Sequence, residues 1–324
     1  MKVRHLPDHV INQIAAGEVV ERPAAVVKEL IENSIDAGAT EIAIDIRDGG
    51  KSLISIRDNG CGMDREDLVA ALDRHATSKL DNDDLDNIQT FGFRGEALPS
   101  IASVSHVRIK TRTGSENTGW QIDIDNGSLS APSPCPFEQG TKVEVRDLFK
   151  KAPARLKFMK TDRAEFTAIR DVVIRQALAN TKTSFRLVHN EKKSLSIQTP
   201  ANVDDLKDFI CDRAARIIGQ DFVENSVFID QLQDGIHLRG LISLPTYHKA
   251  TAQSQYFFVN NRPVRDKLLL GVTRAGYMDV LPGDRHACVI LFLDVPGGEV
   301  DVNVHPAKTE VRFRQAQIVR NLIV

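Results

Sequence analysis

Polar residues with chemical potential recur at helical spacing near the start of the chain. Glu29, Asn33 and Asp36 occupy positions i, i+4 and i+7, which lie on one face of an α-helix. A carboxylate there could orient and deprotonate a water molecule. An amide oxygen is a hard ligand that suits Mg²⁺, which keeps most of its waters and phosphates. On spacing alone, a solvated polar helix face explains these residues better.

A second candidate group comes from two expected strands. Asp58 shares its strand face with two isoleucines, so its carboxylate should point toward the core and need a partner there. A base with an exocyclic amine is one such partner, and a capping role in the turn before Gly60 is another. Gly60 and Gly62 permit close backbone approach. Thr141 shares its face with two valines and could also point inward, although a satisfied strand threonine is the ordinary alternative.

A third group is the segment FGFRGEALPS at residues 91–100, where glycines precede a possible helix start. Free N–H groups at such a turn favour anion binding. The chain has no G-x-x-x-x-G-K-[ST] motif, which excludes a P-loop. The segment RHATSK at 74–79 could also reach a phosphate, although a polar helix end is an equally good explanation.

The elements expected to position these groups alternate between helix and strand. Residues 18–40 predict a helix with Pro23 in its first turn and Gly38 at its end. Residues 41–60 predict a β-hairpin with its turn at 48–50. Further strands are expected at 104–112, 120–125 and 141–149, and a further helix at 162–180. The pattern predicts an α+β fold with a mainly antiparallel or mixed sheet.

A second, smaller α/β domain is expected after residue 199, which gives domains at 1–199 and 200–324. It should contain helices at 204–219 and 268–281 and strands at 226–232, 236–244, 255–261, 287–295 and 299–304. The length of 324 residues suits two domains.

Composition narrows the function. No run approaches the roughly 18 apolar residues of a membrane span, and no signal peptide is apparent. The four cysteines lie far apart, which favours reduced thiols and a cytoplasmic protein over zinc or disulfides. With a net charge of −2, any DNA contact must come from a local basic patch. Arg262, Arg265 and Lys267 form one candidate, and the basic run at 150–160 another, with solvated surface charge as the alternative for each.

Taken together, the segments QIAAGEVVERP, KELIENSIDAGAT, RDNGCGM, RHATSK and GFRGEAL closely resemble the MutL family of GHKL ATPases. The resemblance is close over residues 5–105 and continues through 148–158, 255–266 and 300–313. It implies a GHKL (Bergerat) α/β sandwich followed by a smaller transducer domain with a ribosomal-protein-like α/β fold. Pro99 departs from the pattern, but proline is tolerated in the first turn of a helix.

The resemblance also assigns roles. It implies that Glu29 is the general base of ATP hydrolysis, that Asn33 holds Mg²⁺ and that Lys308 reaches the γ-phosphate. Asp58, supported by Thr141, would accept a hydrogen bond from the adenine amine. The remaining nucleotide contacts that it implies are Asp36, Ala37, Gly60, Gly62, Thr77, Ser78, Lys79, Gly92, Phe93, Arg94, Gly95, Glu96, Ala97 and Leu98.

As a function, the resemblance implies a Mg²⁺-dependent ATPase switch of DNA mismatch repair. ATP would order a lid and an N-terminal arm at residues 5–20 and drive formation of a homodimer. Implied partners are DNA bound without sequence preference through Arg262 and Arg265, a MutS-like mismatch-recognition protein, and a downstream endonuclease or helicase. No membrane partner is expected.

Two other classes of function compete with this one. A DNA-bound scaffold would hold ATP without needing hydrolysis, which the presence of Glu29 argues against. Another member of the GHKL superfamily is the second alternative. A histidine kinase would need a phospho-acceptor histidine on a dimerisation helix, which we do not find in this sequence. A topoisomerase ATPase would lack the GFRGEAL motif that is present here. We expect the chain to be a fragment, so the sequence leaves open whether the whole protein carries an endonuclease.

Overall fold

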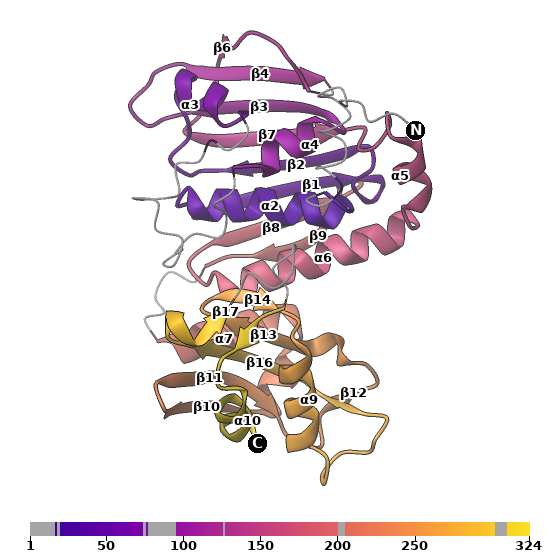
Figure 1. Cartoon of the computed structure of the whole chain (residues 1–324), viewed down its shortest axis with the longest axis vertical. Helices are drawn as coiled ribbons and strands as arrows, with labels where there is room; N and C mark the ends of the chain where they lie inside the picture. The colour runs from indigo at the N-terminus through magenta and orange to yellow at the C-terminus, as the bar shows by residue number, and fades with distance from the viewer. Residues whose placement is uncertain are drawn as a thin grey trace, which may run out of the picture. The chain divides into compact units, whose positions relative to one another are not determined.

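The chain forms two compact units. The computed structural model describes residues 17, 20–73, 76, 95–125, 127–199, 205–301 and 310–324. The first unit comprises Met1–Val173 and Lys182–Gln198, and the second comprises Ile174–Thr181 and Thr199–Val324. Each unit builds helices onto a sheet (Figure 1), so the expected α+β fold is confirmed.

A mixed sheet organises the described part of the first unit. Its order is β5-β4-β3-β7-β2-β1-β8-β9, with β6 paired to β4. β1 and β8 run parallel, whereas the other neighbouring strands run antiparallel. The strands are β1 (Glu41–Arg47), β2 (Leu53–Asp58), β3 (His106–Arg112), β4 (Gly119–Asp125), β5 (Ser128–Leu129), β6 (Ser133–Cys135), β7 (Gly140–Arg146), β8 (Ser184–His189) and β9 (Lys192–Ile197).

Alternation along the strands gives this sheet one apolar face. On β1, Ile42, Ile44 and Ile46 are buried, whereas Glu41 and Arg47 are exposed. Burying each isoleucine contributes about 1.5–3 kcal/mol, so this face fixes the strand register. Helices lie over it (Figure 1). The helices of this unit are, in chain order, α2 (Pro23–Asp36), α3 (Arg65–Ala70), α4 (Ala97–Ala102), α5 (Pro153–Phe158) and α6 (Asp162–Ala179).

Helix α2 carries the first candidate residues, and its ends follow local chemistry. Pro23 opens the helix, where a missing N–H costs nothing. Gly38 has φ +73°, the left-handed conformation that ends helices. The helix is therefore shorter than the predicted span of 18–40.

The second unit has its own sheet and core. The sheet order is β10-β11-β16-β13-β14, and β13 and β16 run parallel. Buried aliphatic residues from the sheet pack against residues of α9 and α10. Its elements are α7 (Leu206–Ile217), α8 (Gln220–Glu224), β10 (Ser226–Gln233), β11 (Ile236–Ser243), β12 (His248–Lys249), β13 (Gln255–Val259), β14 (Arg262–Val264), α9 (Lys267–Gly276), β15 (His286–Ala287), β16 (Val289–Asp294), β17 (Val300–Asp301), β18 (Arg312–Phe313) and α10 (Ala316–Ile323).

Two details of the second unit differ from the sequence-based expectation. Helix α9 ends at Gly276 rather than at residue 281, because glycine weakens a helix interior. Arg262, which lies just beyond the strand expected at 255–261, begins a further strand, β14, which pairs with β13. Its position is therefore fixed by backbone pairing.

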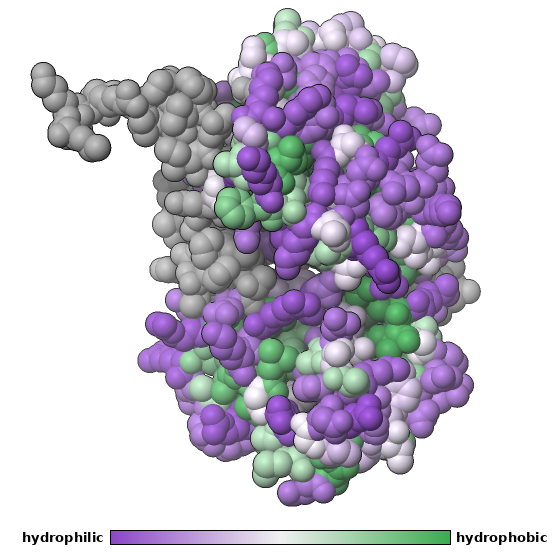
Figure 2. All heavy atoms as spheres, turned by 90° about the vertical axis from the view of Figure 1, so that its right-hand side faces the viewer, coloured by the Kyte–Doolittle hydropathy of each residue, from purple (hydrophilic) through white to green (hydrophobic). Residues whose placement is uncertain are grey.

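Hydrophilic residues cover most of the surface drawn in Figure 2, and hydrophobic residues gather there in small areas. Among the described residues, no helix has the length and apolar character needed to cross a membrane.

Candidate functional site

Asp58 ends strand β2 as a buried carboxylate that three donors hold in place. Its exposed fraction is 7%. Oδ2 accepts a hydrogen bond of 2.8 Å from Ser34 Oγ, and Oδ1 accepts bonds of 3.0 and 3.2 Å from the N–H groups of Gly60 and Thr141. Burial raises the pKa of Asp58, although these hydrogen bonds oppose the shift. A carboxylate has about four acceptor positions, so one position at Oδ2 has no donor from the described residues and can take a further one.

A pair of threonines extends this polar end of the sheet. Thr111 Oγ1 lies 3.1 Å from Thr141 Oγ1 and accepts a 2.8 Å bond from the N–H of Met63. Thr111 is fully buried, and sequence reasoning missed it. Its signal was available, because it shares strand parity with Val107 and Ile109 just as Thr141 does with its valines.

Two glycines let the backbone after β2 approach its neighbours. A Cβ at Gly60 would lie 2.7 Å from the carbonyl oxygen of Ala37. Gly62 has φ +72°, and a Cβ there would lie 2.0 Å from the carbonyl oxygen of Arg112. The N–H of Cys61 donates to Ala37 O at 3.0 Å. The end of α2, including Asp36 and Ala37, is thus tied to the Asp58 turn.

Helix α2 presents Glu29 and Asn33 one turn apart, and both are half-buried. The ammonium of Lys28 lies 3.3 Å from Glu29 Oε1 and 3.1 Å from Glu32 Oε2. Burial alone would lower the pKa of Lys28, but the carboxylates of Glu32 and Glu29 outweigh burial and raise it. Glu32 is only 3% exposed, so Lys28 links a buried carboxylate to the candidate base. The spacing of polar residues in the sequence indicated neither Lys28 nor Glu32 as part of the site.

The oxygen atoms on one face of α2 suit a magnesium ion whose other ligands are phosphate oxygens. Asn33 offers an amide oxygen, and the carboxylates of Glu29 and Asp36 share its helix face. Mg²⁺ usually takes only one or two protein ligands and completes its shell with phosphates and water. Asn33 therefore fits the role of protein ligand.

The described end of the glycine segment forms a tight turn into α4. Gly95 has φ +61°, and a Cβ there would lie 2.2 Å from the carbonyl oxygen of Ala76. Glu96 precedes the helix, and Ala97 and Leu98 form its first turn with Pro99. α4 packs against α2, so this turn belongs to the same side of the unit.

The structure does not describe some of the predicted site residues, and two others belong to the second unit. Thr77, Ser78, Lys79, Gly92, Phe93, Arg94 and Lys308 lie outside the described residues. Arg262 and Arg265 belong to the second unit, where Arg262 is half-buried and Arg265 is exposed.

The basic run at 150–160 is divided between structural contacts rather than forming one free patch. Arg155 stacks on the ring of Phe149 at 4.4 Å and donates to the carbonyl oxygen of Val20. Lys150 and Lys151 form ion pairs with aspartates. The hypothesis of a single DNA-binding run here is therefore weakened.

Family models match both units of the chain. A model described as "Histidine kinase-, DNA gyrase B-, and HSP90-like ATPase" matches residues 21–145. One described as "DNA mismatch repair protein, C-terminal domain" matches residues 214–324.

Curated relatives and solved structures agree with these matches. The DNA mismatch repair protein MutL of Sphingopyxis alaskensis is 50% identical over 100% of this chain and 52% of its own length. That of Paramagnetospirillum magneticum is 48% identical over 100% and 53%. The chain thus spans about half the length of the curated relatives it matches.

Two solved structures share the fold. The first, described as the N-terminal domain of a DNA repair protein, has a TM-score of 0.81 and 26% identity over 97% of this chain and 95% of its own. The Aquifex aeolicus MutL ATPase domain complexed with ADP has a TM-score of 0.67 and 26% identity over 94% and 98%.

Proposed function

Because this chain belongs to the MutL family of DNA mismatch repair proteins and carries a GHKL-type ATPase domain, we propose that it is a Mg²⁺-dependent ATPase switch. ATP binding would drive N-terminal dimerisation and engagement of DNA and repair partners. The observation that carries the proposal is the open acceptor position of Asp58. A buried carboxylate with three fixed donors and one free position suits the single exocyclic amine of adenine.

Two residues of α2, Glu29 and Asn33, would then act on the attacking water and on the magnesium ion. Glu29 takes a proton from a water whose oxygen bonds to the γ-phosphorus, while the bond from phosphorus to the β–γ bridging oxygen breaks. Asn33 would hold Mg²⁺, which neutralises phosphate charge when bound. Backbone N–H groups around Gly95–Leu98 would bind phosphate.

The proposal also includes residues outside the group formed by Asp58 and helix α2. Lys308 would contact the γ-phosphate, and Arg262 and Arg265 would contact DNA phosphates without sequence preference. The remaining phosphate and lid contacts would come from Thr77, Ser78, Lys79, Gly92, Phe93 and Arg94. Residues 1–199 would form the ATPase domain and 200–324 the transducer domain. A MutS-like protein and a downstream endonuclease or helicase would be partners in the cytoplasm.

A double-mutant cycle on Asp58 tests the adenine assignment. Equilibrium binding of ATP is compared with that of purine riboside triphosphate, which lacks the exocyclic amine, in the natural chain and in Asp58→Asn. The natural chain should prefer ATP by about 1–3 kcal/mol, and the variant should lose that preference. Asp123→Asn, on the open face of the same sheet, is the control and should keep it. An equal preference in the natural chain and in Asp58→Asn would remove the assignment.

A further inference from the structure

The open face of the first unit's sheet carries one row of cations without an acid. Strand register aligns Lys110 with Lys142 and Lys142 with Arg57, and Ala43 links Arg57 to Arg186. The row crosses β3, β7, β2, β1 and β8. Neighbouring strands lie about 4.8 Å apart, so the four cations span roughly 19 Å. We call these four residues the cationic row.

The arrangement places like charges opposite one another. Lys142 is flanked on both sides, by Lys110 and Arg57, and like charges directly opposite destabilise a sheet. Neither Lys110 nor Arg186 forms an ion pair with any residue in the described part of the chain. The cationic row therefore has charge to offer an external anion.

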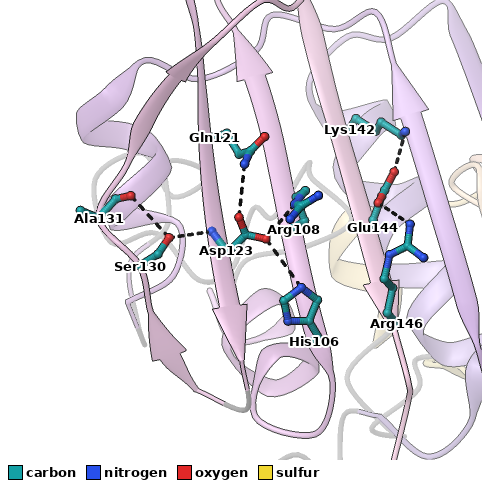
Figure 3. A network of polar contacts seen from close by, with 9 residues as sticks. All are labelled: His106, Arg108, Gln121, Asp123, Ser130, Ala131, Lys142, Glu144 and Arg146. Carbon is teal, nitrogen blue, oxygen red and sulfur yellow. Dashed lines mark hydrogen bonds and ion pairs between the residues drawn. The ribbon is translucent and has the colours of Figure 1, made fainter.

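The neighbouring row holds its acids closer to the sheet. Glu144 bonds Lys142 at 2.6 Å and Arg146 at 3.0 Å, and Asp123 bonds Arg108 at 2.7 Å (Figure 3). The side chains of Glu144 and Asp123 are 15% and 29% exposed, compared with 34% for Lys142. A polyanion would therefore reach Lys142 before Glu144 or Asp123, and the exposed acid beside the row is Glu138, which pairs with Arg57.

The chemistry of the row favours a phosphate backbone over bases. Its members are lysines and arginines, and the aromatic ring beside it, Phe137, lies under the Arg57 guanidinium at 5.4 Å. Base stacking needs an open aromatic face, whereas phosphate binding needs only positioned cations. The length of the row also matches several phosphates of one strand.

From these observations we propose that the cationic row binds the phosphodiester backbone of a nucleic acid without sequence preference. The proposal rests on the DNA binding proposed above, but it places a contact surface on the first unit, separate from Arg262 and Arg265 of the second. Lys110 and Arg186 contribute most, because Arg57 already pairs with Glu138 and Lys142 with Glu144.

The test measures binding of a labelled single-stranded oligonucleotide by fluorescence anisotropy across a salt series, without ATP. The variant combines Lys110→Gln, Lys142→Gln and Arg186→Gln, and leaves Arg57 intact because it adjoins Asp58. The slope of log K against log salt is negative, and each lost phosphate contact makes it less negative by about 0.7. The variant should therefore show a slope that is less negative by roughly 1.4 to 2, the lower value applying if Lys142 stays with Glu144. The control combines Arg163→Gln, Lys192→Gln and Lys193→Gln, which removes the same charge from exposed positions of the same unit and should leave the slope nearly unchanged.

The possible outcomes distinguish binding at the cationic row from DNA binding by the protein in general. An unchanged slope in the row variant, or an equal change of slope in the control, overturns binding at the cationic row while leaving the proposed DNA binding and ATPase in place. Failure of the natural chain to bind the oligonucleotide overturns both DNA claims, and ATP hydrolysis measured without DNA then stands on its own. Loss of polyglutamate binding in the row variant, with oligonucleotide binding intact, would assign the row to an acidic protein instead.

Discussion

The two sides of the first unit's sheet handle charge differently. On the helix-covered side, the buried carboxylates have assigned partners: Asp58 takes three donors, Glu32 takes the Lys28 ammonium and Glu165 takes the Arg22 guanidinium. On the open side, ion pairs such as Arg108–Asp123 lie in water-exposed networks, and some cations have no ionic partner within the described chain. Hydrogen bonds and ion pairs on the covered side thus hold individual carboxylates in position, whereas the open side exposes charged side chains to solvent.

Breaking one ion pair on each side gives the largest expected contrast. Lys28→Met removes the counter-ion of buried Glu32 and should destabilise the unit by about 3 kcal/mol. Arg108→Met on the open side should cost less than about 1 kcal/mol. Urea unfolding followed by fluorescence of Trp120, the chain's single tryptophan, measures both in the first unit. Equal losses would mean that the two sides do not differ as described.

Glycine replacements sharpen the same contrast at the level of the backbone. Gly62 and Gly127 both have positive φ, of +72° and +86°. A Cβ at Gly62 would collide with Arg112 O, but at Gly127 it would meet nothing within 4 Å. Gly62→Ala should therefore cost about 2 kcal/mol more than Gly127→Ala. The same unfolding measurement decides this, and a matching loss in both variants would show that the close approach at Gly62 has no energetic weight.

The pH dependence of stability gives the smallest predicted effect. Burial raises the pKa of Asp58 above its ordinary value of 3.8, so the folded state binds the proton more tightly than the unfolded state. The resulting stabilisation is complete below pH 3.8 and is lost as pH rises through the folded pKa. The unfolding free energy of the natural chain, relative to Asp58→Asn, should fall as pH rises across that window. A flat difference would contradict the raised pKa.

Local patterns predicted the covered side well. Parity placed Asp58 and Thr141 on the inner face, and both are found at the polar end of the apolar rows. The hairpin of β1 and β2 and the main helix also followed from alternation, Pro23 and Gly38. These features depend on residues close in sequence, where strand and helix periods carry the information.

Contacts between distant segments could not be read from the sequence. Nothing in residues 184–189 indicated that they pair in parallel with β1. That pairing places Arg186 in the cationic row. The sequence likewise did not indicate that the hydroxyl of Ser34 donates to Asp58. The partner of a polar side chain depends on which segments the fold brings together, and local sequence patterns do not show which segments those are.

The most direct test of the ATPase assignment measures ATP binding and Mg²⁺-dependent turnover together in the natural chain and in Glu29→Ala. Glu191→Ala, an exposed glutamate of the same unit, serves as the control. We expect Glu29→Ala to bind ATP with nearly natural affinity but to lose turnover, whereas the control keeps both. Turnover at the natural rate in Glu29→Ala would contradict the account, because another group would then have to take the proton of the attacking water.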